Sequence, residues 1–472
     1  MSVHMISIFA LVAMFVLATA LPINMGVIAF VGAFLVGTLV AGMQAKAIMA
    51  GFPAELFLTL VGITFLFAQA QNNGTIDWLV RLAVRAVRGH IAAIPWVMFG
   101  IAAVLTGVGA VSPAAVAIIA PIALGFAAKY RINPLMMGLL VIHGAQGGGF
   151  SPISIYGGIT NKIVQKAGLP LSELTTALVS LGFNFGVALI LFFLFGGMEL
   201  IRRTRKSSGT GGFDNSLAPA GMAAAGVHWE TAAPAEGVAA VQERLAVAGS
   251  GSPETAFMSG SAPQHLSSQP GTADASPSLQ QVATVVGLVL LAVLTLLYKL
   301  DIGFVAISIG LVLSMMAPNV QKRAIGQVSW PEIMLIVGVS TYVGVMQKMG
   351  TIDFVGESVA GLTSPLMAAL LLCFVGAIVS AFASSTAVLG SLIPLAVPFL
   401  QSGTGVDPIG FIAAMAVSST IVDVSPFSTN GALVLANAQG VDRDVFLRQL
   451  MVYGAVVTLT APVVVWLMFV VF

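Results

Sequence analysis

Long apolar runs that carry almost no charge dominate this sequence. Several of them are long enough to cross about 30 Å of hydrocarbon, which takes roughly 20 helical residues. Only 8% of the 472 residues are charged, whereas a soluble domain carries about 25%, so there is too little charge to cover a water-facing surface. Only helices and closed barrels satisfy their backbone polar groups in lipid, and these runs are continuous rather than alternating. The sequence therefore predicts an all-α membrane protein.

The apolar runs form two sets of seven with a polar segment between them. The first set covers 5–20, 23–42, 52–72, 93–109, 111–128, 133–164 and 172–200, and the second covers 280–299, 302–317, 332–347, 364–382, 384–401, 407–438 and 448–472. Residues 207–278 are rich in Ala, Gly, Ser and Pro and poor in aromatic residues, which is typical of disorder. We therefore predict a first membrane repeat at 1–202, a disordered cytoplasmic linker at 203–278 and a second membrane repeat at 279–472.

The first run, Met5–Ala20, resembles the apolar region of a secretory signal peptide, and Ala18-Thr19-Ala20 imitates a cleavage site. No Lys or Arg precedes this run, and a second apolar run begins at about Ile23. We therefore predict that Met5–Ala20 is retained as the first membrane span.

Short motifs recur in the two halves in the same order. Gly74-Thr75-Ile76-Asp77 returns as Gly350-Thr351-Ile352-Asp353, and Ser151–Gly157 returns as Ser425–Gly431 with the shared pattern Ser-Pro-x-Ser-x-x-Gly. Between these motifs, one serine and one proline of each half correspond. The corresponding residues are Ser112 with Ser385, and Pro121 with Pro394. Three collinear matches predict an internal repeat.

In each half, the fourth and fifth runs are separated only by small residues. We predict that each pair forms a re-entrant hairpin, with tips at Ser112-Pro113 and at Ser384-Ser385-Thr386. Each half then has five true crossings, about ten helices in all. Since five is an odd number, the second half lies upside down relative to the first, and the fold is an inverted repeat.

The distribution of basic residues predicts the orientation. With both termini outside the cytoplasm, the cytoplasmic side receives Arg81, Arg85, Arg88, Lys129, Arg131, the cluster 202–206, Lys322, Arg323, Arg443 and Arg448. Only scattered lysines such as Lys46, Lys162 and Lys166 fall outside, as the positive-inside rule requires. Within this pattern, Ile76–Arg88 has the helical spacing of an amphipathic interfacial helix, although an ordinary loop is the alternative.

Two membrane-depth helices are interrupted, at Gly147–Pro152 and at Val424-Ser425-Pro426. Proline cannot donate to the helix ladder, and glycine weakens it. Free amides and carbonyls at such depth are tolerated where they line a site, because helix ends attract ions. The alternative is a proline kink whose serines bond to their own helix. The symmetric pair instead favours one polar chamber formed by two breaks and two hairpin tips.

The chamber is rich in hydroxyls and contains no Lys or Arg, so a doubly negative substrate needs bound cations, and hard oxygen ligands suit sodium. The expected substrate-binding residues are Ser112, Gln146, Ser151, Ser154, Tyr156, Ser385, Thr386, Ser425, Ser428, Thr429 and Asn430. The expected cation-coupling residues are Ser112, Gly149, Ser384, Asp423 and Ser425.

Asp423 and His143 are also candidates for carrying a proton. Each has a structural alternative: Asp423 could pair with local amides, and His143 could bond to a buried neighbour. Asp77 and Asp353 are interpreted as helix-start residues without a transport role.

The stretches His143–Asn161, Asn73–Val80 and Val424–Leu433 resemble the MatC malonate carriers of bacteria. More distantly, the architecture resembles the divalent anion/sodium symporters of the ion transporter superfamily. That resemblance implies a homodimer whose transport domain moves against a scaffold in an elevator motion. Those symporters carry Ser-Asn-Thr at both hairpin tips, and the tip asparagine is absent here, so the exact sodium ligands do not carry over.

We therefore expect a secondary transporter of the bacterial inner membrane that imports malonate together with a cation, and the oxygen-rich site favours sodium as that cation. A proton-coupled dicarboxylate symporter, a cation/proton antiporter and a channel are the alternatives. No cofactor is expected, and the net charge of +1 argues against a nucleic-acid partner. The lone cysteine, Cys373, excludes an intramolecular disulfide. An enzyme is disfavoured because one His and one Asp within the spans make a poor catalytic set.

Overall fold

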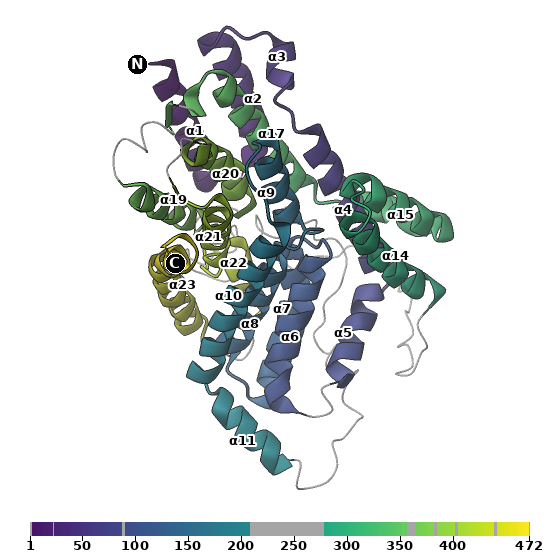
Figure 1. The fold of residues 1–472 in the computed structure, drawn as a ribbon. Coiled ribbons are helices and arrows are strands. Elements are labelled where there is room, and N and C mark those ends of the chain that lie inside the picture. The colour runs from purple at the N-terminus through teal and green to yellow at the C-terminus, as the bar shows by residue number, and fades with distance from the viewer. Residues whose placement is uncertain are drawn as a thin grey trace, which may run out of the picture.

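The computed structural model describes residues 2–21, 23–86, 90–207, 278–352, 354–355, 364–381, 385–401, 405–438 and 441–471. Every regular element in these ranges is helical (Figure 1), as predicted for an all-α membrane protein. Five helices are long and apolar enough to cross a membrane alone, and a bent pair of helices makes a sixth candidate. The predicted disordered linker 203–278 lies outside the described residues except at 203–207 and Ser278. Residues 203–207 belong to a helix, so the prediction of disorder is wrong for them.

The first half contains eleven α-helices in the described ranges. They are α1 Val3–Ala20, α2 Met25–Leu35, α3 Ala45–Met49, α4 Ala54–Asn72, α5 Thr75–Ala86, α6 Ile94–Gly107, α7 Ser112–Tyr130, α8 Pro134–Gly148, α9 Ile155–Lys166, α10 Glu173–Leu194 and α11 Gly197–Ser207. A π-helical turn at Val36–Val40 extends α2, and a 3-10 turn at Ile91–Ala93 precedes α6.

The described part of the second half follows the same order. Its helices are α14 Leu279–Leu296, α15 Ile302–Met316, α16 Pro318–Gly326, α17 Trp330–Lys348, α19 Pro365–Ser380, α20 Ser385–Gln401, α21 Pro408–Ile421, α22 Thr429–Ala436 and α23 Arg443–Trp466, with a π-helical end at Leu467–Val471. The fourteen predicted apolar runs each contain a helix or a broken pair. The short helices α3, α11 and α16 were not predicted as separate elements.

Side-chain caps explain where several helices begin. Asn24 accepts from the amide of Gly26 at the start of α2, and Asp301 accepts from Phe304 at the start of α15. Asn133 and Asp407 cap α8 and α21 in the same way, each followed by a proline that fits the first turn. These caps fall at corresponding places in the two halves.

Helix packing between the halves is reciprocal. The third span of each half packs on the second span of the other, α4 on α15 and α17 on α2. Both crossings are made by glycines in close backbone contact. Gly62 meets Gly303 in the first crossing, and Gly338 meets Gly26 in the second. A Cβ at any of these four glycines would clash with the backbone of the facing helix, so the sequence fixes both crossings by the same means.

Most of the described helices divide into two groups. The frame consists of α1, α2, α4, α14, α15 and α17, and the central bundle consists of α6–α10 and α19–α23 (Figure 1). Within the bundle, the helix pair α6–α7 packs on α8, and the pair α19–α20 packs on α21. The second arm of each pair crosses to the other half, with α7 against α22 and α20 against α9. The bundle therefore brings both hairpin tips to both breaks.

Helix α5 confirms the predicted amphipathic helix over most of Ile76–Arg88. It contacts α4 and α14 of the frame and α6 of the bundle, and it buries Ile76 and Val80. Asn73 accepts from the amide and the hydroxyl of Thr75 at its start. The side chain of Asp77, and all of Asp353, lie outside the described part, so their interpretation as helix-start residues stays a prediction.

Candidate functional site

The two predicted breaks are present and are built alike. The break between α8 and α9 runs from Gly149 to Ser154, and the break between α21 and α22 runs from Val422 to Ser428. In the first, the hydroxyl of Ser151 accepts from the amide of Ile153 at 3.3 Å. In the second, the hydroxyl of Ser425 accepts from the amide of Phe427, also at 3.3 Å. The Ser-Pro-x-Ser-x-x-Gly motif thus specifies one loop conformation twice.

A second serine closes each loop. The hydroxyl of Ser154 donates to the carbonyl oxygens of Gly149 and Ser151, and that of Ser428 donates to the carbonyl oxygen of Ser425 at 2.6 Å. Ser154 also accepts from the amide of Gly157 and so caps α9. The serine hydroxyls of the motif therefore hold the breaks in shape, as the structural alternative anticipated for hydroxyls at a kink. Carbonyls and helix ends remain for a ligand.

The final glycine of each motif has a steric reason. A Cβ on Gly157 would clash with the carbonyl oxygen of Ser151, and a Cβ on Gly431 would clash with that of Ser425. The first turn of the second helix segment therefore rests directly on the backbone of the loop. Only glycine allows this contact, which explains why both copies of the motif end in glycine.

The second break meets the first hairpin tip through Asn430. Its side-chain amide donates to Ser112 Oγ at 2.8 Å and to Asp423 Oδ2 at 2.9 Å, and its backbone amide donates to Asp423 Oδ1 at 3.3 Å. Ser112, Asp423 and Asn430 are all buried. The structure thus joins three of the predicted site residues, from both halves, in one hydrogen-bonded cluster.

Tyr156 joins the first break to the same cluster. Its phenol interacts with the side chains of Ser112 and Thr386, one from each hairpin tip. Asp423 in turn interacts with the side chains of Ser385 and Ser428. A narrow pocket lies here and is lined by Ala110, Ser112, Gly149, Ile155 and Tyr156. Within the described part of the chain, residues of both breaks and of both tips thus lie close together.

The cluster is asymmetric although its backbone is repeated. The alignment that pairs Gly157 with Gly431 also pairs Gly149 with Asp423 and Tyr156 with Asn430. One half therefore contributes a carboxylate and an amide where the other contributes a glycine and a phenol. Within the described part of the chain, no ion pair involves Asp423. A buried carboxylate held only by amides and hydroxyls is well placed to bind a cation or a proton.

Several buried polar atoms near the breaks have no hydrogen-bond partner among the residues that the structure describes. Both polar atoms of the Gln146 side chain are unpaired, although this residue is fully buried and lies one turn before the first break. Oδ1 of Asn430 and Oγ1 of Thr160 are also unpaired. Buried polar groups are normally satisfied, so these atoms are available to a bound substrate or to water.

His143 lies apart from this cluster. Its Nδ1 is 2.9 Å from Oδ1 of Asn184, and its Nε2 is 2.6 Å from the hydroxyl of Tyr453. The amide group of Asn184 donates to the carbonyl of Ser180, which fixes its oxygen toward His143. A neutral imidazole that donates to Asn184 and accepts from Tyr453 satisfies all three groups. This is the structural alternative, and it binds α8 to α10 and α23.

Asn184 and Tyr453 were missed by the sequence analysis, because nothing in the sequence near either residue marks it as a partner of His143. Three other predicted residues are less defined. Ser385 bonds to the hydroxyl of Ser380 at 2.9 Å, and Thr429 is half-buried at the first position of α22. Ser384 lies outside the described residues.

Comparisons with known families agree with this architecture. Residues 1–149 match the family model for the N-terminus of the dicarboxylate carrier protein MatC, and residues 292–471 match the model for citrate transporters. The chain is a carrier and not an enzyme. The resemblance to MatC carriers is thus confirmed for the N-terminal part. Both models describe carriers of small carboxylates, and the described residues include five apolar helices of membrane-spanning length, so this carrier is a multi-pass membrane protein.

Solved structures show a similar fold. One is MtrF of Neisseria gonorrhoeae, described among a class of antimetabolite efflux pumps, with 14% identity, a TM-score of 0.51, and coverage of 93% of this chain and 84% of that one. Another is the YdaH transporter of Alcanivorax borkumensis, with 14% identity, a TM-score of 0.55, and coverage of 89% and 86%. No curated protein sequence matches the chain. At this identity the two structures speak for the fold alone.

Proposed function

We propose that this carrier imports malonate or a similar small dicarboxylate across the bacterial inner membrane together with cations, with sodium as the coupling ion. The observation that supports this most is the cluster of Asn430, Ser112 and Asp423, where both halves of the chain meet at two helix breaks. The site residues are those expected from the sequence, with Ser151, Ser154, Ser425 and Ser428 acting mainly through the loops they hold.

Charge balance requires the cations. The described residues of the cluster include one carboxylate and no Lys or Arg, so a dianion beside Asp423 would bring the local charge to about −3. Burying such charge without neutralisation is prohibitive. Backbone carbonyls at the breaks and the hydroxyls of Ser112 and Ser385 are hard oxygen ligands suited to sodium. Two or more cations would therefore accompany each dicarboxylate.

Gln146 and Asn430 are suited to orient the substrate. Each offers unpaired polar atoms in a buried position, and an amide can donate to a carboxylate without adding charge. The N-termini of α9 and α22, which begin at the breaks, add partial positive charge. This combination favours a compact dicarboxylate with two acceptor ends. The citrate transporter match makes a tricarboxylate a second substrate to test.

For the transport cycle, we propose that the two halves form an inverted repeat and that the central bundle moves against the frame in an elevator motion. The reciprocal packing of α4 on α15 and of α17 on α2 supports the repeat. The helices of the frame pack on one another, and so do those of the bundle. Between the two groups the main contacts are those of α17 with α20 and of α4 with α9, which supports a bundle that can move relative to the frame. The orientation with both termini outside the cytoplasm and a homodimeric assembly belong to the same proposal.

The decisive experiment is uptake of radiolabelled malonate into proteoliposomes, with sodium and proton gradients imposed separately. Sodium-driven accumulation that malonate, but not citrate, inhibits is the expected result. Accumulation driven by protons alone would replace the proposal with the second candidate, a proton-coupled symporter. That candidate is favoured by one observation, the burial of Asp423 without an ion-pair partner among the described residues. No accumulation with either gradient would overturn both.

A further inference from the structure

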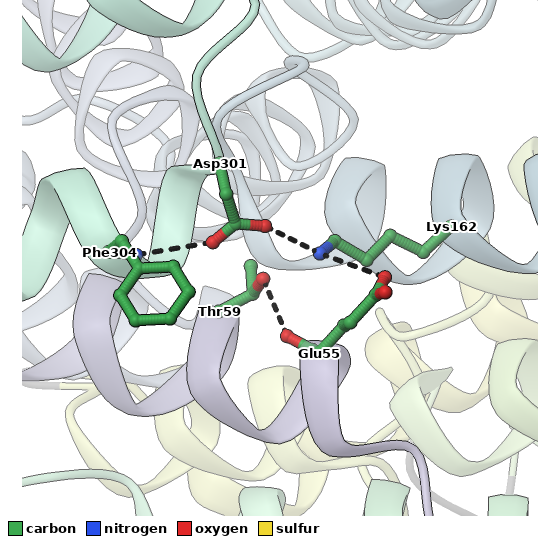
Figure 2. A network of polar contacts seen from close by, with 5 residues as sticks. All are labelled: Glu55, Thr59, Lys162, Asp301 and Phe304. Carbon is green, nitrogen blue, oxygen red and sulfur yellow. Dashed lines mark hydrogen bonds and ion pairs between the residues drawn. The ribbon is translucent and has the colours of Figure 1, made fainter.

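One lysine of the central bundle is bound by two carboxylates of the frame. Nζ of Lys162, on α9, lies 3.0 Å from Oδ2 of Asp301 and 3.7 Å from Oε2 of Glu55 (Figure 2). Asp301 begins α15, and Glu55 is in the first turn of α4. In the part of the chain that the structure describes, the remaining ion pair joins Arg203 to Glu199 within α11. The Lys162 network thus ties the two groups of helices together.

The geometry of the network is well defined at Asp301. Its second oxygen, Oδ1, accepts from the amide of Phe304 at 3.2 Å, so the helix cap fixes the carboxylate that holds Lys162. The side chain of Lys162 is only 20% exposed, whereas that of Glu55 is 88% exposed. Exposed pairs contribute little because solvent screens them. Asp301 is therefore the principal partner, and Glu55 adds a weaker, more distant charge.

The positions that correspond to this network in the other half of the repeat carry no such charges. The two halves can be aligned on the paired glycines of the breaks and of the frame crossings. In this alignment the three charged residues of the network correspond to three neutral residues. The pairs are Lys162 with Ala436, Asp301 with Asn24, and Glu55 with Pro331. Ala436 is exposed, and the amide of Asn24 donates to the carbonyl of Pro331 at 2.9 Å. The contact between α9 and α4 is therefore charged, and its repeat-related counterpart is not.

We propose that the Lys162 network is a latch that stabilises one end state of the transport cycle and has no counterpart in the other. The proposal rests on the proposed alternating-access function. In an inverted repeat, the two halves exchange their conformations when the carrier turns over. Helix α9 would then leave α4 and α15, and α22 would approach α17 and α2. At that position the counterparts of Lys162, Asp301 and Glu55 are all uncharged, so the latch favours only the state in which Lys162 is bound.

Distance measurements between spin labels test the latch. The labels are placed at Lys166→Cys on α9 and Leu297→Cys at the end of α14, after replacement of the buried Cys373 by serine. Lys162→Gln and Asp301→Asn each remove one charge, and asparagine retains the capping oxygen. Each variant should lower the population ratio of the short-distance state about two- to fivefold, the range of a pair that is partly screened.

The double variant should shift the ratio no more than Lys162→Gln alone, because that single variant already loses the contacts to both Asp301 and Glu55. Lys46→Gln, which removes an exposed lysine on α3, is the matched control and should leave the ratio unchanged. Populations equal to the parent in both single variants, or fully additive shifts in the double variant, would overturn the latch. Size-exclusion profiles identify any variant that fails to fold. If one single variant fails to fold, the populations of the other single variant test the latch.

A transplanted latch gives an independent test. Asn24→Asp with Ala436→Lys places the two charges at the repeat-related positions, and aspartate can still cap α2. This variant should raise the long-distance population, and an unchanged distribution would overturn the assignment to one end state. Failure of the latch and failure of the proposed substrate are distinguishable. If the variants shift the distances but the parent takes up no malonate, the latch is retained and the proposed substrate is rejected. If the parent takes up malonate normally but the distances do not shift, the substrate is retained and the latch is rejected.

Discussion

The side-chain amide of Asn430 donates to Ser112 Oγ at 2.8 Å and so joins the broken helix of the second half to the hairpin tip of the first. The same amide group reaches Asp423. One residue therefore connects the carboxylate of the site to both halves of the repeat. Any movement of a dicarboxylate or cation into this cluster must exchange some of these hydrogen bonds.

Replacing Asn430 by alanine should lower the rate of malonate uptake about 10- to 100-fold. The change removes the donor to Asp423 and Ser112, and a hydrogen bond to a charged group is worth about 1.5–3 kcal/mol. Initial rates in proteoliposomes measure the effect. Asn437→Ala, which removes an amide that donates to the carbonyl one turn back on the same helix, is the matched control and should transport normally. Normal uptake by Asn430→Ala would remove this residue from the site.

Asp423→Asn should abolish coupling to the cation without destabilising the protein. The substitution removes the single charge of the cluster but keeps the shape and an oxygen that can accept from the amide of Asn430. Because no described Lys or Arg pairs with this carboxylate, the substitution also removes the cost of burying its charge. The dependence of uptake on sodium concentration should become flat, while the unfolding temperature in detergent stays the same or rises. An unchanged sodium dependence would assign the coupling to other residues.

Gly157→Ala and Gly431→Ala should both destabilise the carrier, because each new methyl group meets a loop carbonyl oxygen. Overpacking of this kind costs about 1–3 kcal/mol, and the equal geometry predicts similar losses in the two variants. Thermal unfolding in detergent measures them. Gly186→Ala in α10 has open space around the new methyl group and should be neutral or stabilising. Unequal losses would show that the two breaks are not equivalent.

Much of this fold could be predicted from the sequence, because the signals are local. Apolar length gave the helices, and the Gly and Pro residues of Ser151–Gly157 and Ser425–Gly431 marked the breaks before any contact was known. The convergence of the breaks followed from the repeat. By contrast, the partners of His143 and Lys162 come from helices far away in the sequence. No local pattern identifies Asn184 or Asp301 as their partners, since such pairs depend on how the helices pack.

The serines of the motif illustrate a second limit. Their hydroxyls are predicted to be ligands because a hydroxyl buried at a helix break within the membrane is costly unless it has a hydrogen-bond partner. In the structure, Ser154 and Ser428 use them on the carbonyls of their own loops. A sequence shows that a polar group needs a partner, but not whether that partner is the backbone or a substrate.

Tyr453→Phe should lower stability and leave the pH dependence of uptake unchanged. The variant removes the hydroxyl that bonds to Nε2 of His143, leaving a buried nitrogen unsatisfied at a cost of about 1–3 kcal/mol. The unfolding temperature in detergent should fall accordingly. A shift of the pH profile of uptake would instead show that His143 carries a proton during transport, and the structural interpretation of this residue would be wrong.

The Lys162 network should persist from pH 8 to pH 5. Burial raises the pKa of Asp301, but the hydrogen bonds from Lys162 and from the amide of Phe304 outweigh it, and the net pKa lies below the usual range. When folding lowers the pKa of a carboxylate, the ionised group stabilises the folded state at any pH above its pKa in the unfolded chain. This stabilisation is lost only as the pH falls through the pKa in the folded state. Glu55 is the other charged group facing Lys162. The difference in spin-label populations between the parent and Asp301→Asn should therefore stay constant across this range and shrink only below about pH 4. A difference that disappears between pH 7 and pH 5 would show that Asp301 is not the group that holds Lys162.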